Sequence, residues 1–234
     1  MFRRRRSIAV LLIMLMLVGV QSISTFSQPK LDEPTVLSDT TSTAESPLAS
    51  DILDMIEVKG RAPKTGYKRS EFGDGWAQVG NCDMRNIMLA RSMTEVKLSE
   101  DNCVVLSGTL QDPYSGATIY FVRGQTTSDD VQIDHVVALS DSWQKGAQAL
   151  SAERRLQLAN DPLNLLPVDG PLNQKKGDSD AASWLPPNKA FRCPYVARQI
   201  AVKSKYGLWV TEAEKSAMKR VLNGCGEQRV PLET

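Results

Sequence analysis

Histidine is almost absent from this sequence: His135 is the one histidine among 234 residues. A site that needs two histidines is therefore excluded, which removes metalloproteases and histidine-rich zinc centres. Neither sign of charge is in excess, because 28 Lys and Arg stand against 27 Asp and Glu, a formal net charge of +1. A strongly basic nucleic-acid coat is excluded, but a local basic patch is not.

Long apolar runs are scarce as well. Ile8–Val20 is an uncharged run of 13 residues that follows the arginines at 3–6. A membrane-spanning helix needs roughly 20 residues, whereas a positive start and a run of this length are typical of a secretory signal peptide. Ser22 and Ser24 are small, but no A-x-A cleavage site is present. Residues 1–24 are predicted to be a signal peptide, with an uncleaved N-terminal anchor as the alternative.

Residues 25–50 are rich in Ser, Thr, Pro and Asp and are predicted to be a flexible tether. Four arginines precede residue 25, and residues 25–50 hold one lysine and four acids, which leaves 23 basic and 23 acidic residues in 51–234. We expect residues 51–234 to form the folded domain, with no net charge to attract a polyanion as a whole.

The four cysteines contain no C-x-x-C pair, which disfavours a zinc ribbon or a dithiol redox motif. An even number in an exported chain indicates two disulfides, for which three connectivities exist. We favour Cys82–Cys103 and Cys193–Cys225 because each bond closes a local segment. Four free buried thiols are the alternative.

Strand-like segments come before the clearest helices, which predicts an α+β fold. A turn signal at Asp112–Gly116 separates two β-prone segments and indicates a hairpin. Ser151 is a predicted helix N-cap, and Thr211 with Glu214 forms a predicted capping box. Strands are expected at 103–110, 117–122, 131–139 and 164–168, a turn at 169–171, and helices at 51–60, 86–93, 140–160, 173–176, 181–184, 194–206 and 211–223.

The lone histidine follows an aspartate inside an apolar segment, Val131–Leu139. Burying this pair is costly without partners. A neutral imidazole is a good general base, and a carboxylate is a hard oxygen ligand for a divalent cation. Adjacent residues on a strand point to opposite faces, so Asp134 and His135 can share a site only at a strand end or a bend. Taken alone, the pair is as compatible with a structural ion pair or hydrogen-bonded histidine.

A second group of polar residues follows at Asn164, Asn173 and Lys176. A side-chain amide can orient a ring or a backbone segment, and its oxygen can bind a hard metal ion. Lys176 lies one turn after Asn173 and therefore on the same helix face, where it could meet a phosphate.

At these positions the sequence resembles the HNH endonucleases, which have a ββα-metal core. It is similar in particular to secreted actinobacterial HNH-family proteins, which carry Asp-His-Val-Val-Ala-Leu, Asn-Asp-Pro-Leu-Asn-Leu-Leu and Asn-Gln-Lys-Lys-Gly-Asp motifs. These motifs stand here at 134–139, 160–166 and 173–178, and further family-like stretches at 184–189 and 205–211 extend the resemblance over about residues 60–225.

The resemblance implies a ββα-metal core with an added N-terminal hairpin and C-terminal helices. It implies that His135 deprotonates water, that Asn164 orients His135, and that Asp134 and Asn173 hold one divalent ion, Mg²⁺ or Mn²⁺. The substrate would be DNA, with RNA as a further substrate class, and no stable protein partner is implied. The third ligand is Asn173 where many relatives have histidine, and the paired C-x-x-C zinc knuckle of many relatives is missing.

Three residues are candidates for contacts to substrate phosphate: Lys176, Arg85 and Arg192. Arg85 is equally compatible with a structural salt bridge. The other basic residues from 175 to 203 form either a phosphate-binding face or merely the solvated sides of helices.

The sequence therefore predicts a secreted or extracellular, metal-dependent endonuclease, or one anchored to the outer face of the cytoplasmic membrane. A non-catalytic, disulfide-stabilised cell-surface binding domain is the main alternative, and in it His135 would be irrelevant to activity. A toxin-like nuclease delivered to competitors is a third hypothesis, which would require a delivery module or an immunity partner.

Overall fold

The computed structural model describes residues 45–231. The predicted signal peptide or anchor, and the tether up to residue 44, lie outside the described residues. None of the helices within 45–231 has the length and apolar character needed to cross a bilayer. The folded unit begins earlier than the expected residue 51: α1 spans Ala49–Met55, and Ala49 and Leu53 are fully buried. Leu48 also forms a β-bridge with Arg229, so the end of the predicted tether belongs to the fold.

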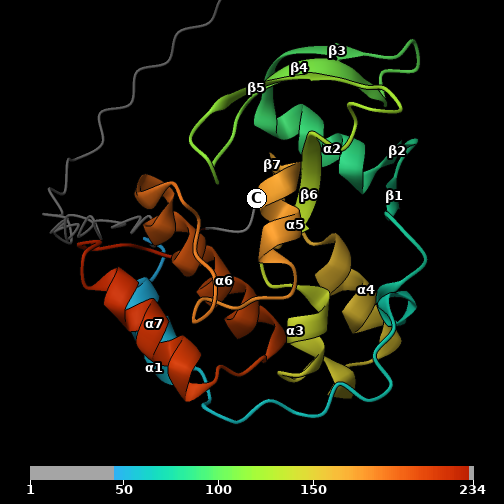
Figure 1. The fold of residues 1–234 in the computed structure, drawn as a ribbon. Coiled ribbons are helices and arrows are strands. Elements are labelled where there is room, and N and C mark those ends of the chain that lie inside the picture. Colours follow the sequence, from blue (N-terminus) through green and yellow to red (C-terminus); the bar gives the residue numbers. More distant parts are fainter. Residues whose placement is uncertain (1–44, 232–234) are drawn as a thin grey trace, which may run out of the picture. The chain divides into compact units, whose positions relative to one another are not determined.

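A three-stranded antiparallel sheet has the order β3 (Met93–Leu98), β4 (Val105–Gln111) and β5 (Thr118–Val122). The predicted hairpin is β4–β5, whereas β3 was not expected. Helix α2 (Met84–Ser92) packs against β4, and β1 (Gln78–Val79) pairs with β2 (Cys82–Asp83) just before α2 (Figure 1). The Cys82–Cys103 disulfide ties β2 to the segment that leads into β4.

A second antiparallel pair, β6 (Val131–His135) and β7 (Leu165–Asp169), is followed directly by α5 (Gly170–Lys176), which packs on both strands (Figure 1). The turn expected at 169–171 is wrong: the Asp169 side chain accepts a hydrogen bond from Leu172 N and begins the helix instead. Gly170 is required there, because a Cβ would lie 1.9 Å from the Asp129 carbonyl oxygen.

Helices fill the connection between β6 and β7 and the C-terminal region. The connection holds α3 (Leu139–Trp143), η2 (Ala147–Ala149) and α4 (Ala152–Asn160), which Ser151 caps as predicted. Two short helices lie elsewhere in the chain. Helix η1 (Arg69–Phe72) precedes β1, and η3 (Lys189–Phe191) leads directly into α6. Helices α6 (Arg192–Tyr206) and α7 (Glu212–Leu222) pack against α1, and the predicted capping box of α7 is present. The helix expected at 181–184 is a turn, and the Cys193–Cys225 disulfide joins the start of α6 to the segment after α7.

The β6–β7 pair supplies residues to two of the three hydrophobic clusters of the described chain, and the segment that follows β6 supplies the third. Val131 and Leu165 pack with α2 and the three-stranded sheet. Val168 packs with α1, α6 and α7, and Val137, just after β6, packs with α3 and α4. The strand ends that carry Asp134 and His135 are therefore held from three sides. The fold is α+β, as predicted.

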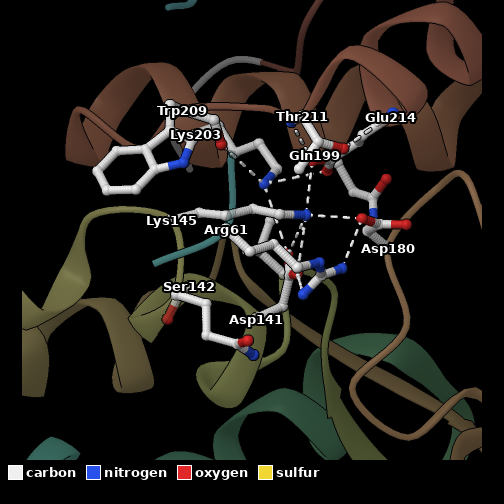
Figure 2. A network of polar contacts seen from close by, with 12 residues as sticks. Arg61, Asp141, Ser142, Lys145, Asp180, Gln199, Lys203, Trp209, Thr211 and Glu214 are labelled. Carbon is white, nitrogen blue, oxygen red and sulfur yellow. Dashed lines mark hydrogen bonds and ion pairs between the residues drawn. The ribbon is translucent and has the colours of Figure 1, made fainter. Parts of the chain in front are cut away.

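Six charged side chains, all but Arg61 buried, form a network between α3, α6 and α7 (Figure 2). The Lys145 ammonium is fully buried and lies 2.7 Å from Asp141, 2.7 Å from Asp180 and 2.6 Å from Glu214. The remaining cations of the network are Lys203, 3.0 Å from Glu214, and Arg61, 2.7 Å from Asp180. Three cations thus offset three carboxylates.

We expect Lys145→Met to lower the free energy of unfolding by about 3–5 kcal/mol, because it leaves buried carboxylates without their central cation. Urea unfolding with the disulfides intact measures this loss. Lys219→Met is the matched control, since Lys219 forms only an exposed pair with Asp54, and it should change stability little. Equal stability of the two variants would show that the network is not a stabilising element.

Candidate active site

His135 is the last residue of β6, at the strand end that the sequence argument required. Its side chain is 7% exposed, and its ring lies parallel to that of Trp76, with centroids 5.8 Å apart. Nε2 lies 2.9 Å from the Ala159 carbonyl oxygen, in the last turn of α4. Because a carbonyl oxygen only accepts, Nε2 carries the proton and Nδ1 of the neutral ring is left as the acceptor.

Burial lowers the pKa of His135 to about 3, and the nearby charges of Arg69 and Lys176 act in the same direction. The hydrogen bond to Ala159 opposes this shift only in part. The imidazole is therefore neutral throughout the physiological pH range. A neutral ring with a free acceptor nitrogen is the form that a general base needs.

Asp134 is buried, and both oxygens of its carboxylate have partners. Oδ1 accepts a hydrogen bond from Lys176 Nζ at 2.9 Å, and Oδ2 accepts one from the Tyr114 hydroxyl. Burial raises the pKa of the Asp134 carboxyl, while Lys176 and Tyr114 act to lower it. Tyr114 lies in the β4–β5 turn and Lys176 ends α5, so this carboxylate joins three parts of the fold.

Asn164 is fully buried just before β7. Its Oδ1 accepts from Val137 N at 2.8 Å, its Nδ2 donates to the Val137 and Leu158 carbonyls, and its own carbonyl accepts from Val136 N. Asn164 thus holds the backbone just after His135 and makes no hydrogen bond to the ring. The contact that orients the ring, from Ala159, comes from a main-chain atom that no residue-type pattern identifies.

Asn173 lies in the middle of α5, and its Nδ2 donates to Gln132 Oε1 at 2.9 Å. Its Oδ1 has no hydrogen-bond partner within residues 45–231. Asn173, Asp134 and His135 all line one cavity of about 470 Å³. The structure therefore brings together the three residues that the sequence analysis assigned to the base and the metal ligands.

Two arginines add positive charge to this cavity. Arg69, on η1, makes no ion pair with any described residue, and it also lines a second hollow of about 180 Å³ that shares Trp76 and His135. Arg85, on α2, donates to the carbonyls of Ser128 and Val131 but leaves Nη1 buried without a partner. Burial lowers the pKa of Arg85, yet an arginine stays charged in proteins. Sequence reasoning missed Arg69 and Trp76, which stand in an irregular stretch without a motif.

Two predicted phosphate contacts do not line the cavity of His135. Lys176 is 1% exposed and donates to Asp134 and to the His135 carbonyl. A buried ammonium needs acceptors and a buried carboxylate needs donors, so the two groups pair with each other. Arg192 lies at the start of α6, where its Nε donates to the Pro186 carbonyl, and it lines a different cavity from His135.

Comparison with known proteins places this site in a family. Residues 83–221, more than half of the chain, match the family described as GmrSD restriction endonucleases, C-terminal domain. The chain belongs to this family. The matched range includes Arg85, Asp134, His135, Asn164 and Asn173, and the GmrSD family supports a nuclease-type enzyme in general.

The chain is also similar to a protein of the fungus Arthroderma benhamiae that is named as an uncharacterized secreted protein. The two are 39% identical over 179 residues, which is 76% of this chain and 84% of the fungal protein. Arg69 and Trp76 lie outside the range that the GmrSD family matches, so these two cavity residues come from the segment that precedes the family domain.

Burial of neutral His135 has a measurable consequence for stability. The unfolded chain binds a proton at this ring below about pH 6.5, whereas the folded protein does so only near pH 3. The free energy of unfolding should therefore fall as pH is lowered from about 6.5 to about 3, by up to about 1.4 kcal/mol per pH unit from this group. Urea unfolding in chelator, compared between the wild type and His135→Asn, isolates that contribution. Parallel pH profiles for the two proteins would contradict the assignment.

Proposed function

We propose that this protein is a secreted, metal-dependent endonuclease of the HNH type that hydrolyses phosphodiester bonds of DNA, with RNA as a further substrate class. The observation that carries the proposal is the neutral His135 ring, fixed through Nε2, in a cavity that also holds a carboxylate, an amide and two arginines. The order strand, strand, helix supports the HNH type, with Asp134 and His135 ending β6, Asn164 preceding β7 and Asn173 on α5.

Each residue has a distinct part in this proposal. Nδ1 of His135 accepts the proton of the water that attacks phosphorus, and the Ala159 carbonyl stabilises the resulting imidazolium through Nε2. Arg69 and Arg85 offset the charge of the phosphate oxygens, and an oxygen at Arg85 Nη1 would satisfy its buried donor. Asn164 positions the His135 backbone without touching the ring.

A divalent ion in this cavity would be held weakly and its coordination completed by substrate. Within residues 45–231 no group of three His, Cys, Asp or Glu side chains could hold a metal. Asp134 is the one buried carboxylate among the described residues that line the cavity. Its Oδ1 already accepts from Lys176 and its Oδ2 from Tyr114, while Asn173 Oδ1 has no partner within residues 45–231. Mg²⁺ accepts such a set, since it commonly binds through one or two carboxylates together with phosphate and water. When bound by Asp134 and Asn173, the ion would polarise the phosphate and stabilise the leaving oxygen.

Export is supported by the predicted signal peptide, by the two disulfides and by the name of the fungal relative. An oxidising compartment keeps such bonds intact. The nuclease would then act on nucleic acid outside the cell.

His135→Ala should reduce cleavage of plasmid DNA by about 10²–10⁴-fold, because no other imidazole can replace the base. Added imidazole should restore part of the activity by entering the vacated space. Gln174→Ala, on the exposed side of α5, is the control and should cleave as the wild type does. Near-wild-type cleavage by folded His135→Ala would overturn the mechanism and favour a non-catalytic binding domain.

Cleavage should stop in excess chelator and return with Mg²⁺ or Mn²⁺. Asn173→Ala should need a higher concentration of either ion, because the Asp134 carboxylate remains, whereas Asp134→Asn should be inactive at any concentration. Calorimetric titration of the metal-free protein with Mn²⁺, with and without a non-cleavable oligonucleotide, should show tighter binding when phosphate is present. Full activity in chelator, or unchanged metal dependence of Asn173→Ala, would rule out these ligands.

A further inference from the structure

Another polar cavity, of about 410 Å³, lies away from His135 and beside the Cys193–Cys225 disulfide, between the start of α6 and the end of α7. Three cations line it: Lys189 on η3, Arg192 on α6 and Arg220 on α7. No acidic residue is among the described residues that line this cavity. The three cations and the walls between them are called the basic cavity below.

The cations of the basic cavity are not neutralised by the protein. Within residues 45–231, neither Lys189 nor Arg192 nor Arg220 forms an ion pair, and Arg192 donates only its Nε to the Pro186 carbonyl. Lys219, the neighbour of Arg220, is by contrast paired with Asp54 at 2.7 Å. Because 51–234 contain equal numbers of basic and acidic residues, three unpaired cations around one hollow are a local excess.

The basic cavity and the active-site cavity border the same short segment of chain. Gly177 and Asp178 line the cavity of His135, and Ala181 and Ala182 line the basic cavity. Asp178 and Ala181 are three residues apart, so their Cα atoms are separated by at most ~11 Å. The two cavities are therefore neighbours along the chain, and a polymer that carries a negative charge at every unit is the kind of ligand that would suit both.

We propose that the basic cavity binds the phosphate backbone of the nucleic-acid strand whose scissile phosphodiester lies at His135. This inference rests on the proposed function and adds a docking surface to it. Guanidinium groups bind phosphate in a bidentate manner, and contacts of this kind position a strand without reading its sequence. The common border with the active-site cavity favours nucleic acid over other polyanions, because a strand carries phosphates at regular intervals on both sides of the one that is cleaved.

The test uses Lys189→Gln/Arg220→Gln, which leaves the Arg192 hydrogen bond to Pro186 intact. Binding of a fluorescent single-stranded oligonucleotide, long enough to span both cavities, is measured by anisotropy in chelator over a range of salt concentrations. The negative slope of log affinity against log salt should become shallower by ~1.4, or ~0.7 for each phosphate that the variant no longer neutralises. The matched control is Arg91→Gln/Lys97→Gln, which removes the same charge from exposed positions on α2 and β3 and should keep the wild-type slope.

An unchanged slope for Lys189→Gln/Arg220→Gln, or an equal change in the control, would overturn the proposal. Loss of binding to phosphatidylserine vesicles with unchanged oligonucleotide binding would also overturn it and assign the cavity to a membrane surface. Hydrolysis of a dinucleotide by the wild type and His135→Ala tests the proposed function separately, because a dinucleotide has a single phosphodiester and cannot place one phosphate at each cavity. If the dinucleotide is not hydrolysed while the slope changes as expected, hydrolysis fails and the docking surface stands.

Discussion

The buried carboxylate of Asp134 is the constraint on which the site depends. A charge with almost no access to water must be matched by donors in the protein. Lys176 from α5 and Tyr114 from the β4–β5 turn supply them. The same turn contacts β7, where Asp112 Oδ1 accepts a hydrogen bond from Asp169 N at 2.9 Å. Satisfying one charge therefore sets how the hairpin, the strand pair and the helix meet, and it places the backbone of His135 beside them.

The surroundings of His135 act on its chemistry through burial. Burial of the ring at the end of β6, beside Trp76 and the Ala159 carbonyl, lowers the pKa of His135 to about 3. The packing that fixes the ring thus also keeps it neutral. The charged network around Lys145 links α3, α6 and α7 to each other. Its charges balance internally, so it leaves the active-site cavity to Arg69 and Arg85.

Charge is distributed unevenly over a domain without net charge. Buried lysines such as Lys145, Lys176 and Lys203 serve the fold, because each is matched by a carboxylate. Cations without a carboxylate partner line the two cavities on either side of residues 178–181 instead. The proposed binding of nucleic acid would therefore depend on where the unpaired cations stand and not on their number.

Sequence patterns determined the elements and much of the site of this protein. The hairpin, the two C-terminal helices, both disulfides and the α+β class follow from local residue preferences and spacing. Asp134, His135 and Asn173 line one cavity because α5 packs against β6. Tertiary structure decided the rest. The sequence could not show that Lys176 is turned toward Asp134, that Arg192 lies at another cavity, or that Ala159 and Arg69 reach His135. Those outcomes depend on which groups are buried together, and burial is a property of packing between segments far apart in the chain.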